Sequence, residues 1–182
     1  MEVAVDLIGP WFIKVNLQEL VFHALTCIDM VTNLPEVICI ENKTSAHMSI
    51  LFENHWLARY PYPPWCIHDK GGEFTGVPLL CMLTVNGFKK ITTTMKNPQA
   101  NAICGRLHQT ISSNLRTKLH HHSPQNLLQA NDTIDTCFSA AAYASKTAIH
   151  CTLNISPGAL VFHRDMILNI PLITDLQLLH KC

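Results

Sequence analysis

Two aspartates stand at positions where strand ends could present them to a ligand. Asp6 lies in the apolar run 3–8, and Asp69 follows the short apolar run 65–68; both runs are typical of buried β-strands. Open α/β sheets bind ligands at the carboxyl ends of their strands, which is where Asp69 would lie. Carboxylate oxygens are the ligands that Mg²⁺ prefers. The two aspartates are therefore candidate metal ligands.

Three motifs occur in order around these residues. They read VAVDLIGPW from position 3, IHDKGGEF from position 67 and NPQANAICGRLHQ from position 97. The set resembles the integrase catalytic core of long-terminal-repeat retrotransposons and retroviruses, where two aspartates are followed, after thirty-five residues, by a glutamate. Thirty-five residues also separate Asp69 from Gly105. The spacing is kept, and Gly105 replaces the family's third acid.

The resemblance implies metal-dependent DNA chemistry. Integrases of this family hydrolyse a phosphodiester near the end of the element's DNA, and the freed 3′-hydroxyl then attacks target DNA. Two divalent ions roughly 3.5–4 Å apart activate the attacking oxygen and stabilise the leaving one. By resemblance Asp6 would bridge both ions, and Asp69 would hold one of them. The second ion would be held by the family's glutamate, and Gly105 offers it no ligand. We therefore expect Mg²⁺ or Mn²⁺ to bind weakly or as a single ion, and the polynucleotidyl transfer to be lost.

No neighbouring side chain is expected to replace the missing acid. His108 lies three residues further along the same predicted helix, but imidazole is a poor ligand for Mg²⁺. A glutamate at the place of Glu73 accompanies the intact triad in the family, so it is not a spare ligand. Gly105 also destabilises a helix by about 1 kcal/mol relative to alanine. This cost favours a degenerative substitution over one that serves a function.

Polar residues on and before this helix are candidates for contact with DNA, because arginine and lysine suit phosphates and amides reach phosphates or base edges. They are Lys96, Asn97, Gln99, Asn101, Arg106, Gln109 and Arg116. For Arg116 a salt bridge to the neighbouring helix is an equal alternative. The partners implied by the resemblance are the element's DNA ends and target DNA, and a homodimer is compatible with it.

Hydrophobic periodicity predicts a mixed α/β domain. Strands are expected at 3–8, where Gly9-Pro10 would end the first, and at 22–31, 37–40, 65–68 and 88–92. Helices are expected at 44–59, around 79–86, at about 98–119 and 125–149, the latter opened by Ser123-Pro124, and after Ser156-Pro157. Residues 93–99 are expected to form a loop. By resemblance this order implies a ribonuclease H-like fold with a five-stranded mixed sheet flanked by helices.

The resemblance also divides the chain. Residues 1–150 would form the integrase catalytic core, and residues 151–182 a C-terminal extension. The run LNISPGALVFHRDM from position 153 looks like the segment that follows the core in retrotransposon polyproteins. Glycine is usual in the family at the place of His163 and asparagine at that of Lys70. The family's upstream zinc-binding and downstream basic domains are not represented, which predicts a fragment of a decayed element.

Composition narrows the function classes. Thirteen basic and thirteen acidic residues give a formal net charge of zero, so any affinity for DNA must come from a local patch. Eight scattered cysteines favour free thiols in a reducing compartment. No signal peptide or membrane-spanning run is evident. We expect an intracellular protein with no membrane contact, nuclear if functional.

Two interpretations remain open. The first is an integrase-derived core that has lost its DNA-integration activity. The second is a non-enzymatic remnant that binds nucleic acid or protein through the old substrate surface.

Among other residues, Trp11, Trp56 and Trp65 are expected in the core or at domain contacts. Three acids are expected to be solvated: Asp29, Glu41 and Glu53.

Overall fold

The computed structural model describes residues 2–40, 42–92, 98–121, 123–150, 154–164 and 166, with side chains throughout except at 98–104. It contains a five-stranded mixed sheet in the order β3-β2-β1-β4-β5. The strands are β1 (Glu2–Val15), β2 (Gln18–Asp29), β3 (Pro35–Ile40), β4 (Trp65–His68) and β5 (Lys89–Thr92). The first three form an antiparallel meander, and β4 and β5 add in parallel to β1. The predicted α/β sheet is confirmed.

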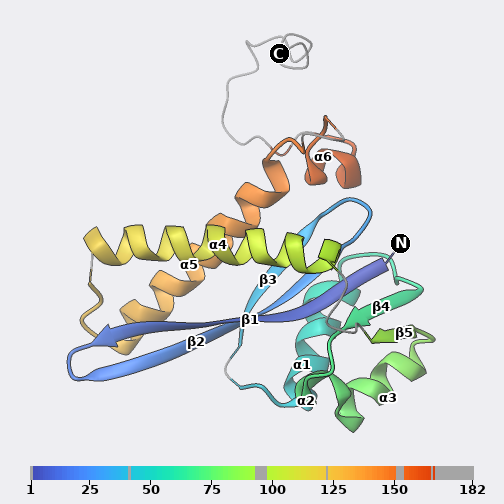
Figure 1. The fold of residues 1–182 in the computed structure, drawn as a ribbon, viewed down its shortest axis with the longest axis horizontal. Coiled ribbons are helices and arrows are strands. Elements are labelled where there is room, and N and C mark those ends of the chain that lie inside the picture. The colour runs from blue at the N-terminus through green and yellow to red at the C-terminus, as the bar shows by residue number, and fades with distance from the viewer. Residues whose placement is uncertain are drawn as a thin grey trace.

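Helices cover both faces of this sheet (Figure 1). One face carries α1 (Ser45–Phe52), the π-helix η1 (Glu53–Leu57), α2 (Gly72–Thr75) and α3 (Val77–Val85). The other carries α4 (Pro98–His121) and α5 (Leu127–Thr147), and α6 (Pro157–Phe162) packs on α5. Within the described residues, none of the helices is long and apolar enough to cross a membrane.

The strand β1 does not end at Gly9-Pro10, so that prediction was wrong. Ile8 pairs with Ala24 and Trp11 with Phe22, and the register shifts between these pairs. Proline cannot donate a ladder hydrogen bond, but a bulge leaves its residue unpaired and lets the strand continue. Gly9 has φ of 119°, and a Cβ there would lie 3.0 Å from the Phe22 carbonyl oxygen. The β1–β2 hairpin consequently extends beyond the other strands (Figure 1).

Side chains that accept backbone hydrogen bonds cap the first turns of three helices. Thr44 and Ser156 cap α1 and α6, as their sequences predict, by accepting backbone hydrogen bonds from His47 and Ala159. The long helix α5 begins at Leu127, two residues after its predicted start at about position 125. Asn126 caps α5 by accepting from the backbone N–H of Gln129 at 2.9 Å. The predicted loop 93–99 lies outside the described residues up to 97, and α4 already includes its last two positions.

Two apolar cores result, one on each side of β1. Alternate residues of the strand point to opposite faces: Val3 and Val5 pack with α1 and α3, whereas Ile8 and Ile13 pack with α4 and α5. The buried stripe of α4 includes Leu107, Ile111 and Leu115. Of the predicted core tryptophans, Trp11 and Trp56 are buried, and Trp65 is half-buried.

Asp29 is not a solvated charge, in contrast to the prediction. Its side chain is 4% exposed at the β2–β3 turn. One carboxylate oxygen accepts from the backbone N–H of Val31 at 3.2 Å, and the other from Thr32 Oγ1 at 2.7 Å. An aspartate that fixes its own turn in this way has its charge satisfied locally. Glu53 is exposed, as predicted, and Glu41 lies outside the described residues.

A second buried acid joins the two helical layers at the edge of the sheet. Glu36 on β3 accepts from Lys146 Nζ of α5 at 2.7 Å, and the Tyr60 hydroxyl donates to the same carboxylate oxygen. Burial, with this contact to Glu36, raises the pKa of the Tyr60 phenol. The edge strand is therefore held from both sides by one carboxylate.

Replacing Asp29 by alanine should lower the free energy of unfolding by about 1–3 kcal/mol, because two partly buried hydrogen bonds to a charged acceptor are lost. Urea denaturation checks this. Glu53→Ala removes an exposed acid and should change stability by no more than about 0.5 kcal/mol. Equal effects of the two substitutions would show that Asp29 does not stabilise the β2–β3 turn.

Candidate functional site

Strand pairing places Asp6 and Asp69 side by side. The parallel ladder between β1 and β4 ends with the pair Val5 and His68. Asp6 is the next residue of β1, and Asp69 directly follows β4. Neighbouring strands lie about 4.8 Å apart, so the two residues start from adjacent positions at the same edge of the ladder. That their carboxylates converge on one ion stays a prediction.

Local hydrogen bonds fix the backbone around Asp6. Its carboxylate Oδ1 accepts from the backbone N–H of Leu7 at 2.8 Å, and Thr26 Oγ1 donates to its carbonyl oxygen at 3.1 Å. Asp6 is half-buried, and Thr26 is fully buried opposite it on β2. Because side chains alternate along a strand, Asp6 shares a face with Ile8, which packs towards α4 and α5. The carboxylate thus belongs to the face that α4 covers.

Asp69 is exposed and oriented by its own turn. Its Oδ1 accepts from the backbone N–H of Gly71 at 2.8 Å, as aspartates do when they initiate turns. Gly71 precedes α2, whose Phe74 is fully buried. A Cβ at position 71 would come within 2.7 Å of the Glu73 side chain. The glycine therefore lets Glu73 fold back over the turn that holds Asp69.

The Cys66 thiol does not add a charged metal ligand to the two aspartates. Cys66 lies on β4, two residues before His68, and is buried. Burial raises the pKa of its thiol to about 12, so it is neutral at pH 7, and it is the thiolate that binds metals. Across the part of the chain with described side chains, no group of three His, Cys, Asp or Glu residues is placed to hold a metal ion. Among the described side chains, Asp6 and Asp69 are thus the two carboxylates that could hold a hard cation at this edge, and their joint binding of one stays a prediction.

Gly105 lies on the exposed surface of α4 with open space around it. A Cβ built there would meet no atom within 4 Å. One and two turns further on, the same flank of the helix contacts β1: the His108 ring packs edge-on against Trp11 at 5.1 Å between centroids, and Trp11 Nε1 donates to Ser112 Oγ at 3.0 Å. Figure 1 shows α4 crossing the sheet in this way. Position 105 can accept a longer side chain without a clash.

The predicted DNA contacts divide into separate groups. Gln109 and Arg116 are exposed and, four and eleven residues beyond Gly105, share its flank of the helix. Arg106 is also exposed but leaves α4 about 100° around the helix, on the other flank. Lys96 and Asn97 lie outside the described residues. Gln99 and Asn101 belong to α4, and their side chains are not described.

The alternative for Arg116 was a salt bridge to the next helix. The salt bridge observed between described side chains joins α5 to β3 through Lys146 and Glu36, and Arg116 takes no part in it.

Sequence reasoning missed Thr26, whose hydroxyl donates to the backbone carbonyl of Asp6. The available signal was one polar residue within the apolar strand run of β2.

Comparisons with known proteins show what this fold resembles. No family model matches the chain, and no curated protein matches it. The catalytic core domain of BIV integrase matches with a TM-score of 0.62 at 14% identity, covering 88% of this chain and 93% of that one. The catalytic core domain of HTLV-2 integrase in complex with magnesium, a trimeric form, matches at 0.63 and 13%, covering 86% and 92%.

A third match is the simian T-cell lymphotropic virus intasome in complex with a PP2A regulatory subunit. Its TM-score is 0.68 at 14% identity, and the match covers 94% of this chain but 57% of that one. At such identities the likeness shows the fold. The chain has the ribonuclease H-like architecture of a retroviral integrase core, as the sequence predicted.

Divalent metal should bind weakly at a single site, with a dissociation constant of about 1 mM, at the weak end of protein Ca²⁺ sites. Titration with Mn²⁺, followed by its paramagnetic relaxation of water protons, measures this. Asp6→Asn combined with Asp69→Asn should abolish binding, whereas Glu53→Gln should leave it unchanged. Binding that survives the double substitution would show that the two carboxylates do not act together.

Proposed function

We propose that this chain is an integrase-like core of a retroelement that retains a DNA-facing surface and has lost strand transfer. The observation that carries the proposal is the placement of Asp6 and Asp69 as neighbours beyond the Val5–His68 pair, combined with Gly105 on the flank of α4 that faces β1. By resemblance, these positions would make up two thirds of a three-acid site. The division into a core at 1–150 and an extension at 151–182 is part of the same proposal.

The chemistry that remains follows from these residues. A bound Mg²⁺ would polarise a phosphoryl oxygen of DNA. Asp6, positioned by Leu7 and Thr26, and Asp69, positioned by Gly71, would hold that ion. No carboxylate reaches in from α4, so the charge that develops on the leaving oxygen is not stabilised by a second ion. Loss of such preorganised charge stabilisation removes a large part of the catalytic effect.

The non-enzymatic alternative uses the same surface. Gln109 and Arg116, on one exposed line of α4, would contact phosphates without any metal. The element's DNA ends and target DNA are the proposed partners, a second copy of the chain is a further one, and the nucleus is the proposed location. Retention of DNA binding without catalysis would favour this reading of the chain as a binding remnant.

The unmodified chain should show no joining of a labelled DNA end to target DNA with Mg²⁺ or Mn²⁺. A gel assay for strand transfer tests this, with Asp69→Asn as the reference for background. Joining above that background would overturn the proposed loss of activity.

Gly105→Glu should rebuild the three-acid site. Glutamate is the better helix former by roughly 0.5 kcal/mol or more, but three carboxylates repel one another without a cation. The thermal midpoint of Gly105→Glu should therefore rise with added Mg²⁺, whereas Gly105→Gln, matched in size and free of charge, should show no such rise. Equal responses to Mg²⁺ would show that position 105 does not face the two aspartates.

DNA binding should depend on Arg116. Arg116→Gln should weaken binding of a short duplex and reduce by about 1 the slope of log affinity against log salt concentration, as loss of one phosphate contact requires. Lys14→Gln is the control and should change neither quantity, because Lys14 alternates with Ile13 and Val15, which pack towards α4 and α5, and so points to the opposite face of the sheet. Fluorescence anisotropy across a salt series measures both quantities. Equal effects of the two substitutions would show that DNA does not bind along this flank of α4.

A further inference from the structure

A cleft opens on the other flank of α4, away from Trp11. It encloses about 220 Å³ between α4, the end of α5, the β2–β3 turn and the segment that leads to α6. Its floor is apolar and buried, formed by Ile28, Pro35, Leu107 and Pro157. This volume is below the roughly 300–1,000 Å³ of pockets for drug-sized ligands. The cleft therefore suits a molecule of one ring or a short chain.

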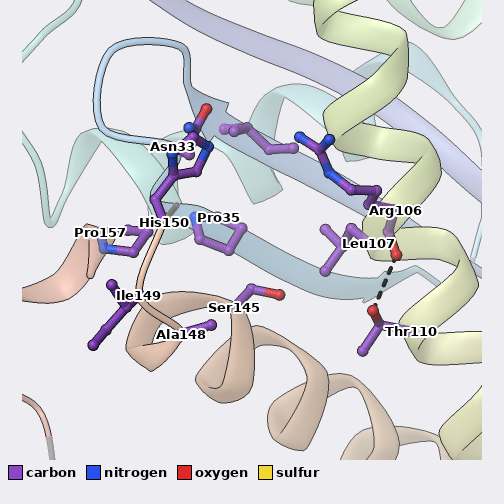
Figure 2. Close-up of a pocket in the computed structure, with 11 residues that line it drawn as sticks. Asn33, Pro35, Arg106, Leu107, Thr110, Ser145, Ala148, Ile149, His150 and Pro157 are labelled. Atoms are coloured by element: carbon purple, nitrogen blue, oxygen red, sulfur yellow. Dashed lines mark hydrogen bonds between the residues drawn. The ribbon is translucent and has the colours of Figure 1, made fainter. Parts of the chain in front are cut away.

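The charge in this cleft comes from Arg106. Figure 2 shows its side chain reaching from α4 across the cleft in the direction of Asn33 and His150. Among the lining residues within the described part of the chain, Arg106 is the one permanently charged side chain, and no acid lines the cleft with it. The nearest turn acid, Asp29, is engaged with Val31 and Thr32. A guanidinium in this setting favours an anionic partner.

Two polar side chains stand opposite the arginine. His150 Nδ1 is buried and has no hydrogen-bond partner within the described residues, although buried polar atoms normally have one. Asn33 adds a side-chain amide at the same end of the cleft (Figure 2). Thr110, by contrast, already donates to the Arg106 carbonyl at 3.0 Å. His150 and Asn33 thus add polar side chains to the end of the cleft towards which Arg106 reaches (Figure 2).

We propose that this cleft binds a small organic carboxylate, whose apolar body lies on Ile28, Leu107 and Pro157 and whose carboxylate pairs with Arg106. The fork of the guanidinium matches a carboxylate with two parallel hydrogen bonds. The apolar floor selects against inorganic anions, which bring no surface to bury there. Ile149, 60% exposed at the margin of the cleft, is apolar surface that such a ligand would cover. This site is separate from the aspartates and does not depend on the proposed function.

Benzoate is the probe, with benzamide as its uncharged counterpart and inorganic phosphate as the anion without an apolar body. Titration of the ¹⁵N-labelled chain should shift the backbone signals of Thr110, Ile149 and His150 with benzoate. Benzamide and phosphate should bind at least tenfold more weakly at these positions. Equal binding of benzamide would remove the role of Arg106, and equal binding of phosphate would remove that of the apolar floor.

Three variants locate the site. Arg106→Gln should weaken benzoate binding at least tenfold, whereas Arg116→Gln, an exposed arginine on the same helix but outside the cleft, should leave it unchanged. Ser145→Leu, which fills the cleft from α5 without altering charge, should abolish binding while the thermal midpoint confirms the fold. Benzoate shifts that persist in Ser145→Leu, or that fall equally in both arginine variants, would overturn the proposal.

Discussion

The parallel pairing of β1 with β4 is the constraint on which the candidate site depends. β1 is central in the sheet and buried on both faces, with Val5 in one core and Ile8 in the other. A slip of one residue would exchange these faces and bury the Asp6 carboxylate with α1 and α3. The cost of burying a charge without partners excludes that register. Two hydrophobic cores thus determine which side of the sheet presents Asp6, and the ladder that ends at His68 brings Asp69 beside it.

Much of this fold could be predicted from periodicity, because strands and helices that bury one face carry their pattern in the sequence. β4 was predicted with its observed bounds, and the caps at Thr44 and Ser156 were evident from residue type. The errors arose where tertiary contacts override local preference. Gly9-Pro10 is a typical strand terminator, yet the bulge is retained because Trp11 beyond it packs on α4. Asp29 was assigned to solvent because nothing in the sequence shows that its turn folds over it.

The candidate site was predictable to the extent that it depends on strand ends. Asp69 follows one apolar run and Asp6 lies within another, and the adjacent backbone positions of the two residues follow once the runs are paired in parallel. Helix faces are harder, because the sequence does not show which neighbour each flank meets. Arg106 and Arg116 were grouped as DNA contacts, whereas the structure directs Arg106 into a cleft on the opposite flank. That cleft could not be predicted, since its lining comes from several elements far apart in the chain.

Gly105 separates the chemistry of this chain from its folding. The contacts that hold α4 in place come from its buried stripe and from His108 and Ser112 on Trp11, and none requires a side chain at position 105. An exposed glycine in a helix costs only about 1 kcal/mol, within what a domain of this size tolerates. Under the proposed function, a carboxylate projecting from such a face would therefore be lost at little cost to the fold. Because stability would not select for the acid, the proposed loss of strand transfer is compatible with an intact integrase-like architecture and with a retained surface for DNA.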